Sequence, residues 1–154
     1  MSSATRRTRA CTLEALDGEL RAALRTHITE LGLEDIESDI LMCCETITVH
    51  QKKGFQRGIR TTLSAVYVTP KWLVWADSHG PNDAAAGAVQ LNQIDVGEDR
   101  SNIRYPITPA QWLNITGRHT DQPKTGVTFI ALGTEADGQK FRRILAAAWR
   151  RAAS

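Results

Sequence analysis

The sequence predicts a mainly β domain (α+β by element count) that ends in an amphipathic helix. Between residues 40 and 132 it divides into short stretches rich in β-branched and aromatic residues, separated by Gly and Pro turns. From Phe141 to Ala152 the apolar residues instead recur every three or four positions, which is the spacing of one helix face. The chain has 154 residues, 42% hydrophobic and 23% charged, as expected for one globular domain.

The N-terminal region is predicted to contain no strand. Residues 1–10 carry Arg6, Arg7 and Arg9 without an apolar stretch, which predicts a disordered basic tail and not a secretory signal. Residues 11–39 are predicted to form an N-terminal amphipathic helix and its linker. The helix is expected from Thr12, its N-cap, to Leu31, with Gly32 as the stop.

About seven antiparallel strands are expected after this helix. Their predicted ranges are 40–49, 59–69, 72–76, 86–96, 102–105, 111–116 and 126–132. In the first of them the apolar alternation changes phase near Cys44 and Glu45, after which Ile47 and Val49 take over. A phase change of this kind predicts a β-bulge that bends the strand. Thr134 is the expected cap of the final helix.

Three features resemble the pleckstrin-homology (PH) family. The stretch 63–75 looks like the second and third strands of such domains, joined by a tight turn at Pro70. The stretch 126–133 leads directly into the final helix, as the family's last strand does, and Trp149 lies where these domains place a tryptophan across the open end of the sheet. The resemblance covers residues 40–151. It implies that residues 40–154 form a PH-like domain, of a bacterial-type variant with an extra N-terminal helix.

For the fold, this resemblance implies a partly open barrel of two near-orthogonal sheets, with the C-terminal helix closing one end. For function, it implies a non-catalytic binding module. The first hypothesis is a protein-interaction or scaffold domain, whose partner groove would include Phe141, Leu145 and Trp149. A homodimer formed through the N-terminal helix remains an open arrangement, and the partner is not identified.

The alternative hypothesis is peripheral binding to anionic membrane lipid through a basic loop. PH domains that bind inositol phosphates carry a lysine and an Arg-x-Arg-like pair in their first loop. The corresponding residues here are Lys52, Lys53, Arg57 and Arg60, although the two arginines are separated by two residues instead of one. Each basic residue near an anionic membrane contributes about 1 kcal/mol, so four are enough for weak, salt-sensitive binding, and Phe55 could insert at the loop tip.

An enzyme of unknown class is the minor alternative, because no catalytic motif is found. Nucleophile-elbow, phosphate-loop and zinc-protease patterns are absent from the sequence. Asp77, Ser78 and His79 are consecutive, but neighbours in one loop rarely reach triad geometry, so a polar loop is expected. Trp72, Trp75 and Trp112 could line a ligand slot, yet strand positions favour the core for at least two of them. No catalytic residue is assigned.

Cofactors, metals and nucleic acid are not predicted. Cys11, Cys43 and Cys44 are expected to be reduced, structural thiols, since neither a disulfide framework nor metal-ligand spacing is present. Acidic residues between Thr12 and Glu45 nearly cancel the basic clusters, leaving a net charge of +2, which argues against nucleic-acid binding. No stretch has the roughly 20 apolar residues of a transmembrane helix. Cytoplasmic localisation is the default expectation.

Overall fold

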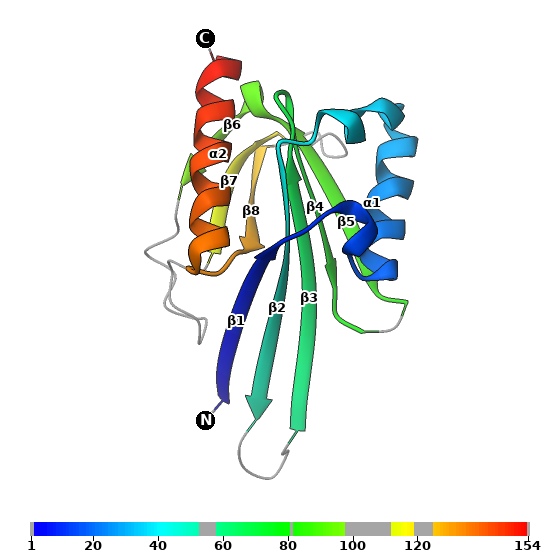
Figure 1. Cartoon of the computed structure of the whole chain (residues 1–154), viewed down its shortest axis with the longest axis vertical. Coiled ribbons are helices and arrows are strands. Elements are labelled where there is room, and N and C mark those ends of the chain that lie inside the picture. Colours follow the sequence, from blue (N-terminus) through cyan, green and yellow to red (C-terminus); the bar gives the residue numbers. More distant parts are fainter. Residues whose placement is uncertain (1, 53–57, 81, 98–111, 119–124, 154) are drawn as a thin grey trace.

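The computed structural model describes residues 2–52, 58–80, 82–97, 112–118 and 125–153, and their fold is mainly β, as predicted (Figure 1). Five strands form one antiparallel sheet in the order β1-β2-β3-β4-β5, and three form a second in the order β6-β7-β8. The strands are β1 (Ser2–Ala10), β2 (Met42–Lys52), β3 (Gly58–Val68), β4 (Trp72–Ser78), β5 (Ala84–Gln90), β6 (Ile94–Gly97), β7 (Trp112–Arg118) and β8 (Thr125–Ala131). The helices are α1 (Gly18–Glu30) and α2 (Ala136–Ala153), with short 3₁₀ turns η1 (Leu13–Ala15), η2 (Glu34–Asp39) and η3 (Leu91–Gln93).

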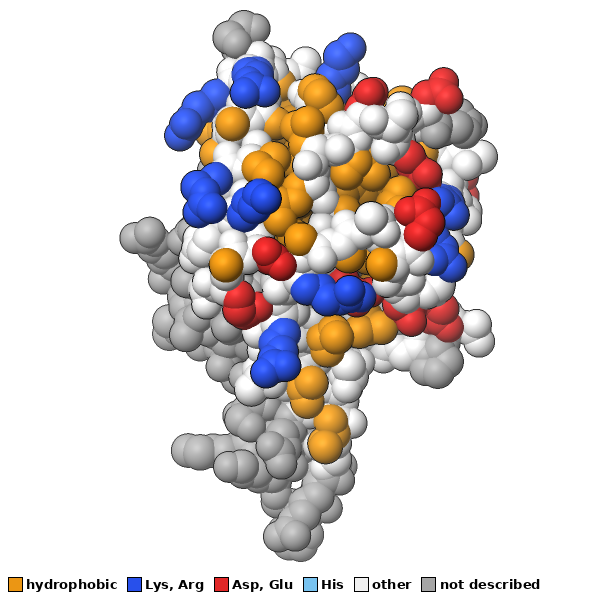
Figure 2. All heavy atoms as spheres, in the orientation of Figure 1, with side chains coloured by type: hydrophobic (Ala, Val, Ile, Leu, Met, Phe, Trp, Pro, Cys, Tyr) orange, Lys and Arg blue, Asp and Glu red, His pale blue; other side chains and the backbone are white. Residues whose placement is uncertain are grey.

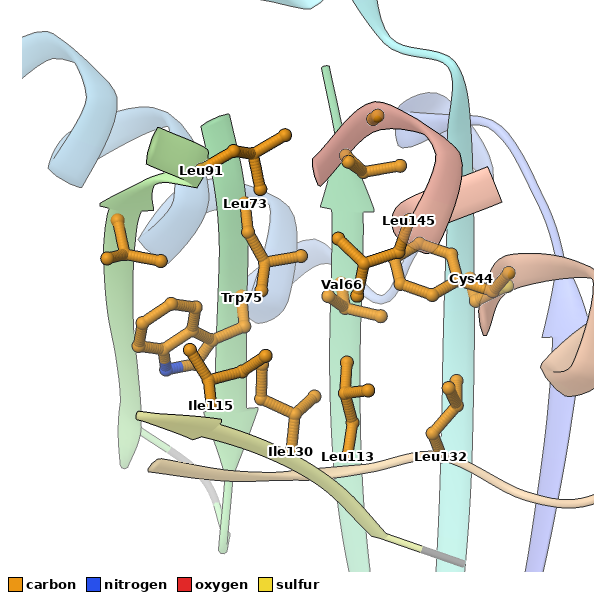
Figure 3. Packing of buried hydrophobic residues seen from close by; sticks show 14 of the residues in the cluster. Cys44, Val66, Leu73, Trp75, Leu91, Leu113, Ile115, Ile130, Leu132 and Leu145 are labelled. Atoms are coloured by element: carbon orange, nitrogen blue, oxygen red, sulfur yellow. The ribbon is translucent and has the colours of Figure 1, made fainter. Parts of the chain in front are cut away.

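The larger sheet is covered on both faces. Helix α1 packs on one face, where its buried residues Leu20, Leu24 and Ile28 meet a cluster that includes Tyr67 and Val74. The smaller sheet and α2 cover the other face and enclose the main core. In Figure 3 the strands of the smaller sheet run across those of the larger, with leucine, isoleucine and valine side chains filling the space between them. Among the described residues the two sheets stay separate and do not close a barrel.

The predicted C-terminal helix is confirmed as α2, and four of its residues fix its position. Phe141 and Leu145 are fully buried in the main core. Trp149 is partly buried, and its indole Nε1 donates a hydrogen bond of 2.7 Å to the carbonyl oxygen of Ile94. At the other end, the Arg142 guanidinium donates to the carbonyl oxygens of Leu132 and Gly133, which ties the helix to the end of β8.

The prediction of a disordered tail at residues 1–10 is wrong. Residues 2–10 form β1, which pairs with β2 from Ser2 opposite Lys52 to Ala10 opposite Cys44. Its outer edge is partly covered by the start of α2 and the residue before it. The amide of Thr8 donates to Glu135 Oε2 at 2.6 Å, and the amide of Ala10 donates to Asp137 Oδ2 at 2.8 Å. The sequence pattern did not predict this strand, because the side chains that contact β2 from it are polar and give no hydrophobic alternation.

Three further features of the elements differ from the prediction. The first element is a strand, not a helix, and the helix expected from Thr12 is divided into η1 and α1, whose N-cap is Asp17. The stretch 86–96 contains two strands, β5 and β6, separated by η3. The expected bulge in β2 is absent, because its pairing with β3 runs without interruption from Met42 to Lys52. The strand expected at 102–105 lies outside the described residues.

Replacing Phe141 by Ala tests the packing of α2 on the core. Because the ring is fully buried, its loss leaves a cavity, and we expect the free energy of unfolding to fall by about 3–5 kcal/mol in urea denaturation. Lys140→Ala is the matched control, since the neighbouring lysine is exposed and its replacement changes stability by about 0.5 kcal/mol or less. Equal stability of the two variants would contradict this packing.

Candidate functional site

The face of the larger sheet that meets the smaller sheet changes from apolar to polar along its strands. Cys44, Val66 and Trp75 form one cross-strand row of the main core. Side chains two positions further along a strand point to the same face. The rows that follow are polar: first Thr46, Ser64 and Asp77, then Arg6, Thr48 and Thr62, and then His50 and Arg60.

Apart from Thr46, the residues of these polar rows line a hollow of about 320 Å³ between the two sheets. Trp112 from β7 and Phe129 from β8 form its opposite wall, with their ring centroids 6.3 Å apart in an edge-to-face arrangement. His79, which follows β4, also lines it. The hollow therefore combines an aromatic wall with a polar wall carrying two arginines, two histidines and one carboxyl group.

Arg6 is the most constrained charge in this hollow. Only 6% of the residue is exposed, its Nε donates to Thr48 Oγ1 at 2.9 Å, and its guanidinium carbon lies 4.2 Å from the centroid of the Trp112 ring. Burial lowers the pKa of Arg6 to about 10, against the opposing effect of the Asp77 charge. Arg6 stays protonated at neutral pH, so a cation is held in a poorly solvated position.

His50 and Asp77 both have pKa values displaced toward their neutral forms. Burial is the largest cause of the lowered pKa of His50, and the nearby charges of Arg6, Arg60 and His79 lower it further. Burial also raises the pKa of Asp77, although a hydrogen bond from Ser64 opposes the effect. With two guanidinium groups and at most one carboxylate, the hollow has a net charge of at least +1 at neutral pH.

Only part of the predicted basic loop lies within the described residues. Arg60 is exposed and lines the hollow, whereas Lys52 ends β2. Lys53 and Arg57, together with Phe55, lie outside the described residues. The predicted lipid cluster is therefore represented by one described side chain, and that side chain faces the inter-sheet hollow.

The predicted partner groove on α2 needs correction. Phe141 and Leu145 are 0% exposed, so their side chains belong to the core and are not available to a partner. Trp149 is partly buried and anchors α2 to Ile94. The helical periodicity identified the buried face of α2 correctly, but not an open groove.

Sequence reasoning missed most of the residues that meet in the hollow. The sequence pattern places Arg6 in a tail, and Asp77 and His79 in a polar loop. Alternation along β4 places Asp77 and His79 on the inner face, while Ser78 is buried and donates to the carbonyl oxygen of Gly80. One signal in the sequence could have found the site. In β2, β3 and β4, every second residue after the core-facing positions is polar and still points to the inner face.

Among the described residues, no three His, Cys, Asp or Glu side chains are grouped so that they could hold a metal ion. In the same part of the chain, neither helix is both long and apolar enough to cross a bilayer. Figure 2 shows basic side chains gathered over α2 and several acidic ones over α1. No described residue of either helix lines the hollow.

Comparison of the chain with protein-family models, with curated proteins and with solved structures gives no match. Inferences about function therefore come from the geometry of the chain itself.

Replacing Arg6 by Gln tests the electrostatic coupling inside the hollow. Removing the positive charge takes away one cause of the lowered pKa of His50, so we expect that pKa to rise toward its ordinary value. The titration is followed by NMR of the imidazole carbon-bound protons. Arg143→Gln, at an exposed position on α2, is the control and leaves the pKa of His50 unchanged. An unchanged His50 pKa in Arg6→Gln would contradict the coupling.

Proposed function

We propose that the chain is a non-catalytic binding domain of PH-like fold that holds an oxyanion in the hollow between its sheets. The ligand class is a small organic molecule with a phosphate or carboxylate group. The observation that carries the proposal is the buried cation Arg6, which faces the same hollow as Arg60, His50 and His79.

The charge balance supports an anionic ligand. Burial disfavours the charged form of Arg6 even with the Asp77 charge nearby, and the exposed Arg60 adds a second positive charge to the same hollow. Charge-assisted hydrogen bonds from arginine to an oxyanion are short and strong, and they are stronger in a poorly solvated site than in water. An incoming phosphate or carboxylate would therefore be stabilised here more than on the open surface of α2.

The dimensions and the aromatic wall support an organic ligand. A volume of about 320 Å³ is near the lower end of the range for small-molecule sites, roughly 300–1,000 Å³. Trp112 and Phe129 offer apolar contact opposite the charged groups. A compact ligand with an apolar body and one anionic group matches both walls.

The order of the elements supports the PH-like part of the proposal. Strands β2–β5 belong to one sheet, β6–β8 to the other, and α2 follows, which is the order of seven strands and a helix expected from the resemblance. In this description β1 and α1 are additions. Because Arg6 lies on β1, the added strand would supply the central charge of the site.

Calorimetric titration with phenyl phosphate tests the proposal. We expect binding at neutral pH and low salt, and a loss of affinity of at least about tenfold in Arg6→Gln and in Arg60→Gln, since each removes a charged hydrogen-bond donor. Arg143→Gln is the matched control and retains the wild-type affinity. Benzyl alcohol, which has the ring but no charge, gives no binding heat.

Two results of this titration would reject the oxyanion site. One is the absence of binding heat with phenyl phosphate, benzoate and inorganic phosphate alike. The other is equal affinity of all three arginine variants. Circular dichroism of each variant separates a lost site from a lost fold, and Arg60→Gln is the safer variant because Arg60 is exposed.

Peripheral lipid binding is the second candidate, favoured by exposed apolar residues on the β2–β3 hairpin. Ile59 and Ile47 are 72% and 37% exposed on the face of this hairpin opposite the hollow. The exposed Arg7 of β1 pairs with Ile47, and exposed apolar side chains beside a basic residue suit contact with an anionic membrane.

Sedimentation with anionic and neutral vesicles tests this second candidate. We expect the wild type to pellet with anionic vesicles at low salt and Ile59→Glu to remain in solution, while Ile59→Glu keeps its affinity for phenyl phosphate. Thr61→Glu, on the same face of β3, controls for the added charge. If wild-type protein stays in solution with both vesicle types, lipid binding is rejected.

A further inference from the structure

Besides the charged hollow, the structure holds a pair of neighbouring thiols, next to the point where β1 ends. The structure has three free cysteines, of which Cys43 and Cys44 are buried and Cys11 is partly exposed. Ala10 pairs with Cys44, so the next residue, Cys11, lies opposite Cys43, and its amide donates to the Cys43 carbonyl oxygen at 3.0 Å. The two cysteines are thus close in space although 31 residues separate them in the sequence.

The backbone spacing at this position allows a disulfide. Directly opposite residues joined by ladder hydrogen bonds in an antiparallel pair have Cα atoms about 5.5 Å apart. Disulfides span Cα separations of roughly 4.4–6.8 Å. A cross-strand bond between Cys11 and Cys43 therefore requires side-chain rotation and little movement of the backbone.

The two thiols already interact, and their environments differ. A hydrogen bond from Cys43 lowers the pKa of Cys11, and the charge of Arg9 lowers it further, against the opposing effect of burial. The same hydrogen bond and burial raise the pKa of Cys43. Cys11 is the more readily ionised and the more exposed of the pair, which makes it the nucleophile.

An external reagent can reach Cys11, the partly exposed member of the pair. Cys11 and Cys43 both line a surface hollow of about 330 Å³, together with Thr12, Leu13, Ile40 and Leu41. Cys44 is in a different environment: it is fully buried on the opposite face of the sheet, and burial is the largest cause that raises its pKa, to about 12. Cys11 and Cys43 therefore share one surface hollow, whereas Cys44 lies outside it.

We propose that Cys11 and Cys43 form an oxidisable dithiol that closes to an intramolecular disulfide on reaction with a small-molecule disulfide such as oxidised glutathione. The Cys11 thiolate attacks one sulfur of the reagent, forming a mixed disulfide and releasing one glutathione thiolate, which takes up a proton. The Cys43 thiol then loses its proton and attacks the Cys11 sulfur, forming the Cys11–Cys43 bond and releasing the second glutathione. The protein is oxidised by two electrons, and the reagent is reduced to two thiols.

The bond would change the stability of one particular strand. Strand β1 is an edge strand next to the N-terminus, a position where local opening costs the least free energy. A Cys11–Cys43 bond would join the C-terminal end of β1 to β2, which limits this opening. It would also restrict the unfolded chain across residues 12–42. Oxidation would therefore hold β1, and with it Arg6, against the sheet.

Oxidation of the full chain with glutathione disulfide, followed by alkylation and peptide mass spectrometry, tests this proposal. We expect loss of two of the three thiols, a Cys11–Cys43 linked peptide, and a reduced Cys44. The midpoint of thermal unfolding should rise by roughly 5–10 °C and return to its original value with dithiothreitol. Cys44→Ala is the matched control and still forms the bond.

Two variants separate the steps of the reaction. Cys43→Ser should stop at a stable mixed disulfide on Cys11, because no resolving thiol is present. Cys11→Ser should leave Cys43 unmodified, because Cys43 is only 4% exposed. The proposal is overturned if wild-type protein keeps all three thiols, links Cys44 to either partner, or forms only disulfide-linked dimers.

Discussion

A guanidinium group kept largely out of water is the feature on which the organisation of the hollow depends. Arg6 is held between the hydroxyl of Thr48 and the face of Trp112, one group from each sheet. Cation–π contact and one hydrogen bond recover part of the solvation that burial removes, and Asp77 supplies an opposing charge. The two sheets are thus joined by an apolar core at one end and by a charged contact at the other.

The position of Arg6 depends on contacts that Thr8 makes towards the C-terminal end of β1. The hydroxyl of Thr8 lies 2.7 Å from that of Thr46 and accepts a hydrogen bond of 2.6 Å from the amide of Gly133, just before α2. Glu135 Oε2 accepts a hydrogen bond from the backbone amide of Thr8. These contacts fix the register of β1 against β2 and α2, and the register in turn directs Arg6 into the hollow. The fold and the site therefore share one network of polar contacts.

The sequence was most informative where burial follows a simple period. The helical stripe of Phe141, Leu145 and Trp149 predicted α2, and β-branched runs predicted most of the strands. The stripe did not predict an accessible groove, because the residues that define a helix face in the sequence are those the core covers. Helix α1 begins at Gly18 and not at Thr12 because Asp17 is its N-cap.

The site was poorly predicted for a related physical reason. Hydrophobic alternation cannot follow a strand whose inner face becomes polar, and for this reason the change of phase to Ile47 and Val49 wrongly predicts a bulge. The strand continues without a bulge, Ile47 is exposed on the outer face, and Thr48 and His50 occupy the inner one. Arg6 gave no signal in its own neighbourhood, because only pairing with a distant strand brings it to the site.

The most direct test of this account is NMR detection of the arginine Nε–H groups during titration with phenyl phosphate. It reports which guanidinium groups meet the anion, independently of the overall affinity. The account predicts saturable changes at Arg6 and Arg60, with Arg143 unaffected. Changes confined to the arginines of α2, or no saturable change at Arg6, would contradict the claim that the charged hollow between the sheets is the binding site.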